Sequence, residues 1–559
     1  MDKDFITERS HGQLILILMI AAYFLLMFGN GAISLTHPDE VFYVQTAKEM
    51  IQHKSWLTPM IFDKPQFEKP IFCYWLLISA LKWGGATPFA ARFWPALFGI
   101  LGVAVTYWIA WMLFGSKRTA FLSGLVLSSS LIYLALSRAV LTDMIFSILV
   151  VITIGFFYLA HKYPRFRGPG IVLHCFFMAL AVLAKGVLGL TFPLGTALVY
   201  LIYKKDLAFL KNKAFISGAL VFSVVALPWH MLMYQQYGQT FISEYWYNDH
   251  VRRIIDAEHQ KSNTWYFYLI TMMGGVMPWT LFLFPALAGI NQKLKERSSS
   301  TDALLFLLVW IAVVFIIVQS AASKLASYIF PVFPAIAILL GFYLDDLISK
   351  GGKASEKPLA KCLYFSIGLA VLMPLGAVVA SRVYHEYVAN SFGLYLFAAL
   401  SLVWVMAVLM FFRRKNHLAV ILAQAFMTVN LLVVVAFSLP SIEPWVSCKE
   451  ICDKFQGIDQ SKSPILTSKF YARGVRFYTD RNIAVMDING EGFFSPHPIP
   501  FLNSDDKVRN FLFERPLTYA IVKKNDLKDL QRIVDGHALK LTELNHIGGK
   551  FIVKIENRR

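Results

Sequence analysis

The sequence is poor in cysteine and in charged residues. Cysteine occupies only 5 of the 559 positions, and Asp, Glu, Lys and Arg together make up 16%. The cysteines show neither zinc-ligand nor redox spacing, so we expect neither kind of site. No glycine-rich phosphate loop opens a helix in the C-terminal region, and there is no internal repeat or low-complexity linker. These absences argue against a nucleotide-binding domain there and against a repeat protein.

Histidine and cysteine spacing gives little sign of a metal or redox centre. The histidines lack HExxH-like spacing, so no metal site is predicted. Cys448 and Cys452 lie four residues apart in a region predicted to be outside the cytoplasm. This spacing leaves two alternatives open, a disulfide or two free thiols on one helix face. The histidines considered are His37, His53, His250 and His259.

Apolar and basic residues are in excess. Hydrophobic residues make up 57% of the chain and the mean hydropathy is +0.55, above the range of soluble domains. A polytopic membrane protein is the class that fits. The formal net charge of +18 alone would suggest nucleic-acid binding. Many of the Lys and Arg residues lie in short loops between apolar runs, where they signal topology and attract anionic lipids, so no nucleic-acid partner is expected.

About 20 predominantly apolar residues are needed for a helix to cross a membrane. Thirteen segments are candidates, and two of them are divided at Lys185-Gly186. The first follows a short charged N-terminus and lacks a small-residue cleavage site, so we interpret it as an uncleaved span. The candidate spans are residues 13–35, 89–114, 119–138, 141–160, 171–185, 186–203, 214–234, 265–290, 303–322, 327–348, 363–382, 391–412 and 418–438.

The distribution of basic residues predicts the orientation. With the N-terminus in the cytoplasm, every cytoplasmic loop is basic, as the positive-inside rule requires. Thirteen spans then place the tail after Leu439 outside the cytoplasm, at the same face as the loop of residues 36–87. The basic loops are residues 117–118, 161–167, 204–213, 291–297, 350–361 and 413–415.

The expected fold is mainly α, with a transmembrane domain over residues 1–439 and a soluble α/β domain over residues 440–559. In the outer loop, apolar residues at helical spacing predict a membrane-surface helix over residues 39–53, and a second is expected over residues 71–83. The tail is expected to hold strands and helices. The strands are residues 465–466, 475–478, 483–486, 519–522 and 551–555, and the helices are residues 507–513 and 527–534.

Four carboxylates lie near the outer mouths of the predicted spans. Asp39 and Glu40 follow the first span, Glu68 lies in the same loop, and Asp143 begins the fourth span. Acidic residues at these places also cap helices, and for the first pair this alternative is as strong as a functional role. Ionisable residues near lipid are costly, so the group as a whole indicates a functional site.

Several cations are predicted at the same face, although the positive-inside rule expects few there. Each one alone is better explained by a side chain that extends to the lipid headgroups. Together they favour an anion site, for which a lipid-linked phosphate is the natural ligand. Aromatic residues in the loop 234–264 either stack on a sugar or form an interfacial belt, and both alternatives stay open. The cations are Lys69, Arg92, Arg138, Lys185, Arg252, Arg253 and Lys324.

In their order and predicted side, these motifs resemble those of the 4-amino-4-deoxy-L-arabinose (aminoarabinose) lipid A transferases, within the protein mannosyltransferase-like C-type glycosyltransferases. The resemblance covers nearly the whole chain. It implies a polyprenyl phosphate such as undecaprenyl phosphate as sugar carrier, lipid A as acceptor and no other cofactor. It also implies transfer on the periplasmic side of the inner membrane, a lipopolysaccharide modification linked to polymyxin resistance. The motifs are Asp39-Glu40 with Tyr43, Glu68-Lys69-Pro70 with Tyr74-Trp75, Arg138 with Thr142-Asp143, and Ser323-Lys324 with Tyr328 and Pro331.

The resemblance also implies roles for individual residues. Asp39 matches the catalytic acid of the first loop, Asp143 matches the second acidic position, and Glu40 is a further catalytic candidate. The family often carries an arginine three residues after the first acid, where this chain has Phe42, so another cation has to take its place. The candidates for binding the donor phosphate are Lys69, Tyr328, Arg92, Arg253 and Lys324. The candidates for binding the rest of the substrates are Glu68, Tyr43, Tyr74, Trp75, Arg138 and His250.

The expected reaction is a single displacement with inversion by a monomeric enzyme, because one carboxylate is better supported than a nucleophile–acid pair. An aminosugar carries an ammonium group, so Glu40, Glu68 or Asp143 is expected to contact it. Two other functions stay open, namely transfer of another sugar to a protein or glycan, and transport or lipid flipping. Charges gathered at one face, without a half-repeat, favour an enzyme over a transporter.

Overall fold

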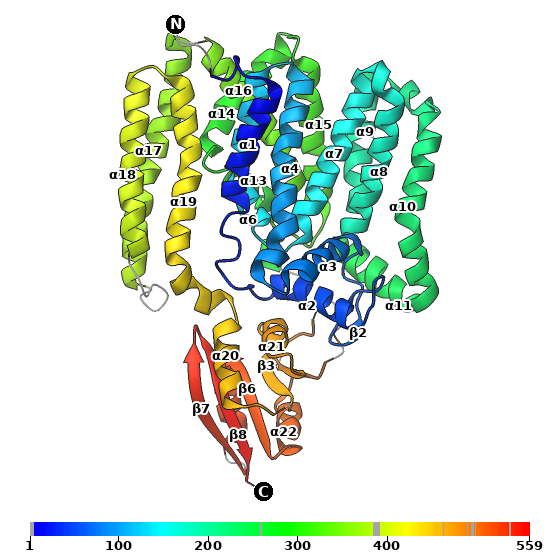
Figure 1. Cartoon of the computed structure of the whole chain (residues 1–559), viewed down its shortest axis with the longest axis vertical. Coiled ribbons are helices and arrows are strands. Elements are labelled where there is room, and N and C mark those ends of the chain that lie inside the picture. Colours follow the sequence, from blue (N-terminus) through cyan, green and yellow to red (C-terminus); the bar gives the residue numbers. More distant parts are fainter. Residues whose placement is uncertain are drawn as a thin grey trace.

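A helical bundle and a small α/β domain make up the protein, whose computed structural model describes residues 5–257, 260–350, 352–383, 392–461, 463–488, 490–493, 497, 499–535 and 538–558. The bundle helices run roughly along the long axis, and the α/β domain hangs from one end of the bundle (Figure 1). Helix α1 (His11–Leu26) begins at the opposite end. We call the end that carries the α/β domain the domain end.

Nine helices in the described part of the chain are long and apolar enough to cross a membrane. Two bent pairs, α5 (Lys117–Ser128) with α6 (Leu131–Ser137) and α13 (Phe267–Gly275) with α14 (Thr280–Lys295), pass the same test together, and α1 and α9 (Leu188–Lys204) are shorter apolar helices. These elements lie where the spans were expected, so the polytopic helical fold is confirmed, whereas the number of crossings stays a prediction. The nine are α4 (Pro88–Phe114), α7 (Thr142–Lys162), α8 (Arg167–Lys185), α10 (Ala214–Tyr237), α15 (Thr301–Ser320), α16 (Phe333–Lys350), α17 (Gly352–Val383), α18 (Phe392–Arg413) and α19 (His417–Val446).

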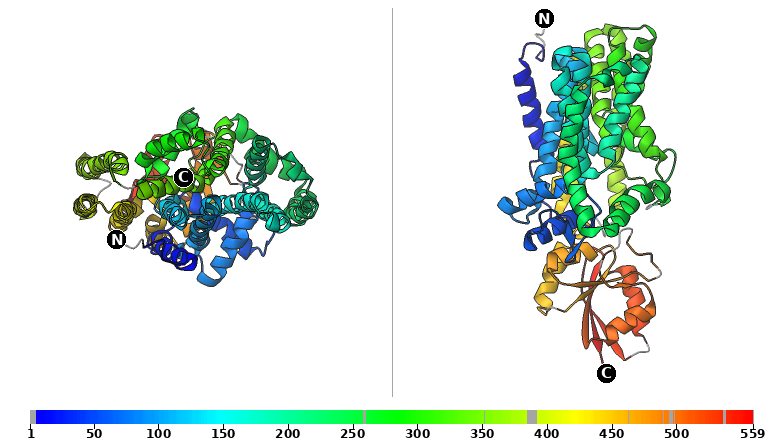
Figure 2. Two further views of the ribbon diagram at one scale, coloured as in Figure 1. Left: turned by 90° about the horizontal axis from the view of Figure 1, so that it is seen from above. Right: turned by 90° about the vertical axis from the view of Figure 1, so that its right-hand side faces the viewer.

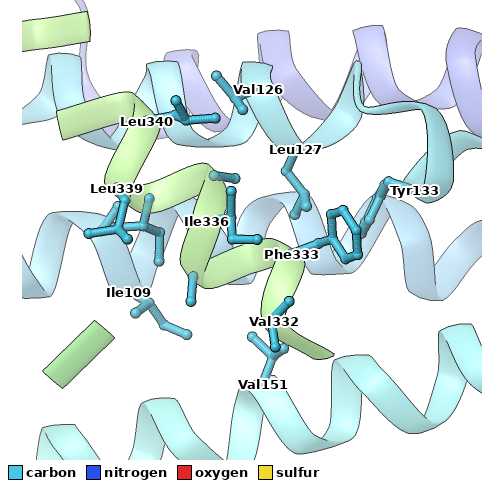
Figure 3. Close-up of a cluster of buried hydrophobic side chains, with 14 of the residues drawn as sticks. Ile109, Val126, Leu127, Tyr133, Val151, Val332, Phe333, Ile336, Leu339 and Leu340 are labelled. Atoms are coloured by element: carbon cyan, nitrogen blue, oxygen red, sulfur yellow. The ribbon is translucent and has the colours of Figure 1, made fainter. Parts of the chain in front are cut away.

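Helix α16 packs against α4 and α5 in the core of the bundle (Figure 3). Ile336 and Leu340 of α16 belong to the same buried cluster as Leu127 of α5. A Cβ at Gly341 would come within 2.6 Å of the backbone nitrogen of Ser123, so glycine permits this close approach of the two helices. Within a membrane such packing, more than the hydrophobic effect, holds helices together.

Two helices lie at the domain end of the bundle, beside the α/β domain (Figure 1). Helix α2 (Asp39–Gln52) carries acidic residues in its first turn, where they face the positive end of the helix dipole. Helix α3 (Phe72–Gly84) buries Tyr74, Leu77, Ile78 and Leu81, which share one helical face. A hairpin of β1 (Met60–Ile61) and β2 (Lys64–Pro65) lies between the two helices in the chain. Both helices lie where two helices were expected, over residues 39–53 from their apolar spacing and over residues 71–83.

The C-terminal domain is a six-stranded sheet with helices beside it (Figure 2). The strand order is β5-β4-β3-β6-β8-β7, with parallel pairing from β5 to β6 and antiparallel pairing of β6, β8 and β7. The strands are β3 (Ile465–Ser468), β4 (Ile483–Met486), β5 (Phe501–Leu502), β6 (Leu517–Lys523), β7 (Leu539–Ile547) and β8 (Lys550–Asn557). The helices are α20 (Lys449–Ile458), α21 (Ala472–Thr479), α22 (Asp505–Phe513) and α23 (Lys524–Val534).

Helix α21 joins the C-terminal domain to α2. Arg476 of α21 has a guanidinium nitrogen 2.8 Å from the Asp63 carboxylate and 3.6 Å from that of Glu49, whose side chain is completely buried. At the edge of the contact, Lys48 pairs with Asp480 at 3.1 Å. These charges fix the domain against the helix that begins with Asp39.

Two features of the tail differ from what the sequence predicted, and a third decides between two alternatives that the sequence left open. Residues 475–478, expected as a strand, belong to α21, because Ala472, Val475 and Thr479 recur at helical spacing and are buried on one side. Helix α19 continues to Val446, beyond the expected boundary after Leu439, with two prolines inside its last turns. Cys448 and Cys452 are buried and free, so of the two alternatives the structure has the separate thiols.

Candidate functional site

The adjacent residues Asp39 and Glu40 have opposite environments. Asp39 is exposed at the first position of α2, whereas Glu40 is buried. The Glu40 carboxylate accepts hydrogen bonds from Arg92 at 2.5 and 2.8 Å, from the backbone and hydroxyl of Thr36 at 2.9 Å and from the Val140 nitrogen at 3.0 Å. We call this arrangement the Glu40–Arg92 clamp. It joins α2, α4 and the start of α7.

All five N–H donors of Arg92 in the clamp are used within the protein. Three nitrogen–oxygen contacts of 2.8 to 3.1 Å go to the carbonyl groups of Asn30, Ile33 and Ser34, and the remaining two go to Glu40. Burial alone would raise the pKa of Glu40, but the hydrogen bonds and charge of Arg92 hold it below its ordinary value. This geometry gives both residues a structural role, and it leaves Arg92 without a donor for a phosphate.

A second group of charges lies among the loops of the domain end. The Lys69 ammonium donates to both carboxylate oxygens of Asp249, at 2.8 and 2.9 Å. Arg253 approaches the same carboxylate at 3.0 Å and donates to the Tyr328 hydroxyl at 2.7 Å. The Tyr328 ring lies under the Lys185 ammonium, 4.6 Å from the ring centre. We call these five residues together with Asp143, which accepts from Lys185, the Lys69 cluster.

The members of the Lys69 cluster come from five separate segments. Lys69 precedes α3, Asp143 and Lys185 lie at span ends, and Tyr328 lies just before the short helix η5 (Phe330–Val332). Asp249 lies in the π-helix η3 (Ile242–Arg252), and Arg253 follows it. π-Helical turns are rare and frequently occur at functional sites. The fold therefore brings together residues that lie as far apart in the sequence as Lys69 and Tyr328.

The carboxylates of this region differ in their electrostatic surroundings. Burial alone would raise the pKa of Asp249, but the charges of Lys69 and Arg253 lower it. Burial raises the pKa of Glu68, and the nearby charges of Arg473 and Lys69 offset only part of this shift. Asp249 is thus held as an anion, whereas Glu68 binds a proton more readily than an ordinary glutamate.

Tyr43 interacts electrostatically with three of the predicted carboxylates. Its phenol is buried, which raises its pKa, and Tyr74 and the charges of Asp143, Asp39 and Glu68 act in the same direction. Three of the four carboxylates singled out from the sequence therefore act electrostatically on one tyrosine of α2. Their assigned roles stay predictions.

A cation from the C-terminal domain reaches this region. The Arg473 guanidinium lies over the Phe42 ring, 4.3 Å from its centre, and 3.7 Å from Glu68. Arg473 also donates to Nε2 of His497 at 3.1 Å. Burial and the charge of Arg473 lower the pKa of His497 to about 3, so this imidazole is neutral.

The other candidate residues lie around these groups. Tyr74 is buried and accepts a hydrogen bond from Gln66, whereas Trp75 is partly exposed and donates to the Trp56 carbonyl. Arg138 donates to carbonyl groups at the end of α1, and Lys324 donates to Asn263. The structure does not place Trp75, Arg138 or Lys324 in contact with the Lys69 cluster through the hydrogen bonds described.

His250 packs beside the cluster at the break between α8 and α9. Its Nδ1 donates to the Tyr245 carbonyl at 2.8 Å and its Nε2 accepts from the Val187 nitrogen at 3.3 Å. Gly186 has φ +82°, and a Cβ there would come within 2.2 Å of His250 Nε2. A glycine is therefore needed at this break.

An apolar cavity of about 730 Å³ lies between α1, α5 and α19. Most of its lining is aliphatic or aromatic, and Thr36, Glu40, Arg92 and Arg138 lie along its wall. Its volume and lining suit a lipid chain. Among the described residues, no group of three or more His, Cys, Asp or Glu side chains could hold a metal ion. His259, one of the histidines considered, lies outside the described residues.

Comparison with known proteins places the chain among glycosyltransferases. Residues 13–242 match the profile of the dolichyl-phosphate-mannose-protein mannosyltransferase family. The segment that is similar to this family makes up less than half of the chain. The resemblance inferred from the motifs is thereby confirmed over this segment.

Two named relatives and one unnamed relative extend the match. An undecaprenyl phosphate-alpha-4-amino-4-deoxy-L-arabinose arabinosyl transferase of Proteus mirabilis is 26% identical over 83% of this chain and 82% of that protein. A transferase of the same name from Erwinia tasmaniensis is 28% identical over 67% of this chain and 66% of that protein. An uncharacterized protein of Aquifex aeolicus is 26% identical over 84% of this chain and 87% of that protein.

A solved structure shares the fold over nearly the full length. The crystal structure of ArnT from Cupriavidus metallidurans bound to undecaprenyl phosphate superimposes with a TM-score of 0.79, at 20% identity, over 98% of both chains. The match includes the C-terminal domain, because it covers almost all of this chain. The fold of membrane helices with a C-terminal α/β domain is therefore shared with that protein.

Sequence reasoning missed Asp249 and Arg473 as members of the site. Asp249 had a local signal, since it lies next to His250 and four residues before Arg253 in a loop rich in aromatic and charged residues. No local sequence pattern pointed to Arg473, because its position depends on how α21 packs against α2.

Proposed function

We propose that this chain is an integral-membrane glycosyltransferase that moves a sugar from a polyprenyl phosphate to a phosphate of lipid A. The proposed sugar is 4-amino-4-deoxy-L-arabinose, and the proposed place is the periplasmic face of the inner membrane. The names of the relatives and the fold shared with a transferase that binds undecaprenyl phosphate support this function. The observation that carries it is the convergence of Lys69 and Arg253 on Asp249, with the Tyr328 hydroxyl bonded to Arg253.

The Lys69 cluster suits a leaving phosphate. In the proposed reaction an acceptor oxygen forms a bond to the anomeric carbon, the bond from that carbon to the carrier phosphate oxygen breaks, and the carrier phosphate leaves with the electron pair. Preorganised cations stabilise the negative charge that develops on such a leaving group. Lys69 and Arg253 would exchange part of their pairing with Asp249 for the phosphate, while the Tyr328 hydroxyl donates beside them.

Asp39 is the proposed partner of the acceptor. It is exposed at the start of α2, one turn from Tyr43, so an incoming group can reach it. For a hydroxyl acceptor it would take the proton as a general base. A lipid A phosphate is already ionised near neutral pH, and in that case Asp39 orients the acceptor.

Glu68 is the proposed partner of the sugar amine. Of the three carboxylates considered for this role, Glu40 is saturated by Arg92 and Asp143 accepts from Lys185. Oε1 of Glu68 is buried and lacks a hydrogen-bond partner among the described residues. An ammonium group would donate to it. Equal turnover of neutral-sugar and aminosugar donors would contradict this assignment.

Mass spectrometry of lipid A from cells with and without the chain tests the function. We expect an added aminopentose only when the chain is present, and its loss in the Asp39→Asn variant. Unchanged lipid A together with a new glycoprotein or glycan product would instead establish another acceptor. Movement of the sugar lipid across sealed vesicles without a covalent product would indicate a transporter.

A further inference from the structure

Arg473 belongs to the C-terminal domain, yet it lies beside the proposed transfer site. It is the second residue of α21, the helix that the ion pairs of Arg476 and Lys48 hold against α2. Its guanidinium covers Phe42, which follows Asp39 by one helical turn and so shares a face of α2 with it. The docking of the domain therefore places a cation next to the proposed acceptor partner.

The hydrogen-bonding capacity of Arg473 is largely unused. A guanidinium has five N–H donors, and in the described residues the Arg473 side chain makes one hydrogen bond, to His497. Glu68, at 3.7 Å, is beyond hydrogen-bond distance. The Nε of Arg473 is buried and has no hydrogen-bond partner in the described part of the chain. Buried donors without acceptors are costly, so this one is suited to a ligand that supplies an oxygen.

The surroundings of Arg473 favour an anion as that ligand. The face of the Phe42 ring holds the guanidinium by a cation–π contact, which orients it without using its N–H groups. His497 is neutral and therefore adds no charge of its own beside Arg473. The carboxylate of Glu68, the residue before Lys69, lies 3.7 Å from Arg473 and interacts with the charges of both cations. An anion bound at Arg473 would thus lie next to the Lys69 cluster.

We propose that Arg473 binds a phosphate group of one of the two lipid substrates and positions it beside Asp39 and Lys69. Planar guanidinium groups pair well with phosphate oxygens, because two N–H groups can donate in parallel. The C-terminal domain then contributes directly to substrate binding. This inference rests on the proposed function, since it presumes that both substrates carry phosphate.

Binding measurements on the full-length protein in detergent test the proposal without requiring turnover. The probes are undecaprenyl phosphate alone and bis-phosphorylated lipid A alone, titrated separately against the wild type and Arg473→Gln. We expect about 10- to 100-fold weaker binding of one of the probes, the range for a hydrogen bond to a charged group. The probe affected identifies the source of the phosphate, the donor carrier or the acceptor.

Two further variants separate binding from folding. Arg473→Lys keeps the charge but loses the planar guanidinium with its parallel N–H donors, so we expect an intermediate loss of binding affinity. In Phe42→Arg combined with Arg473→Gln, the guanidinium is supplied from α2 at nearly the same place, and we expect partial rescue of binding. Arg481→Gln is the matched control in the same domain, because Arg481 pairs with Asp459 away from the site.

The outcomes distinguish a failure of the proposed function from a failure of the proposed role of Arg473. A wild type that binds neither probe contradicts the proposed function. A wild type that binds a probe, with Arg473→Gln folded and binding both probes equally well, overturns the role of Arg473. If Arg473→Gln fails to fold, the role of Arg473 is tested with Arg473→Lys and with the double variant Phe42→Arg/Arg473→Gln. Normal binding by Arg473→Lys together with no rescue by arginine at position 42 would then also overturn it.

Discussion

Arg92 and Arg473 each lie beside a glutamate at the domain end of the bundle, buried Glu40 and partly buried Glu68, but their environments differ. Arg92 gives every donor to protein acceptors, and Glu40 accepts from three different residues. Arg473 and Glu68 are separated by 3.7 Å, and each has a buried atom without a hydrogen-bond partner among the described residues. A saturated ion pair holds elements together, whereas an unsaturated one can exchange a partner for a ligand. Four changes test this contrast.

The largest effect is expected at Asp39, the exposed neighbour of the clamp. Asp39→Asn removes the charge but keeps the shape. Transfer should fall about 100-fold through lost orientation of a phosphate acceptor, and about 100- to 10,000-fold for a hydroxyl acceptor that needs the base. Thermal stability should be unchanged, because Asp39 lies outside the clamp. Transfer rates with the purified protein measure this. Asp480→Asn, a change at another exposed carboxylate of the same face, should retain activity, and full activity of Asp39→Asn would remove it from the mechanism.

Breaking the clamp should act on stability instead. Arg92→Met leaves the buried Glu40 carboxylate without its counter-ion, and removal of one partner of a buried pair costs about 3 to 5 kcal/mol. Denaturation in detergent should show this loss, while the folded fraction still binds undecaprenyl phosphate. Arg532→Met, at an exposed pair with Asp505, is the control and should change little. Loss of lipid binding with unchanged stability would contradict the structural role of Arg92.

A change at Lys69 should lower activity more than stability, in contrast to a change at Arg92. Lys69→Gln removes a donor from the developing phosphate charge, and loss of one such donor lowers kcat about 100- to 1,000-fold. Asp249 keeps Arg253 as a partner, so the melting temperature should fall little. Rate and melting measurements on the same preparation separate the two effects. Lys48→Gln, which loses only the pair with Asp480, is the matched control. A Lys69 variant that is as active as this control would exclude a role in stabilising the leaving group.

The smallest effect is a pH dependence of the clamp. Because the pKa of Glu40 is lowered in the folded protein, its charge adds stability above its ordinary value of 4.5, and this is lost as the pH falls through the lowered value. The stability difference between wild type and Glu40→Gln should therefore be constant near neutral pH and narrow on acidification. Thermal unfolding at a series of pH values measures it. A difference that is independent of pH would show that the carboxylate charge is not what Arg92 stabilises.

The sequence predicts most of the fold, because membrane helices can be identified from local hydropathy. The break at Lys185-Gly186 was predicted for this reason, and apolar spacing predicted the first of the two helices at the domain end, over residues 39–53. Residues 475–478 were misassigned because Val475 and Tyr478 suit a strand by composition, whereas their helical burial depends on the neighbours that α21 meets.

The site was predictable only in part. Asp39, Lys69 and Tyr328 could be singled out because charged and hydroxyl groups at span ends are unusual and because their motifs resemble a family. Glu40 and Asp39 could not be told apart, since burial decides between them and the sequence does not give it. The place of Arg473 over Phe42 follows from contacts between segments more than four hundred residues apart, which no local pattern encodes.

The complete burial of Glu49 makes the two parts of the chain interdependent. Its carboxylate lies in α2, yet a counter-charge for it, Arg476, comes from the tail. A protein shortened after α19 would lose that counter-charge and leave a buried carboxylate in α2 without it. Chimeras that exchange tails between relatives should therefore work only when the incoming domain supplies a basic residue at this contact.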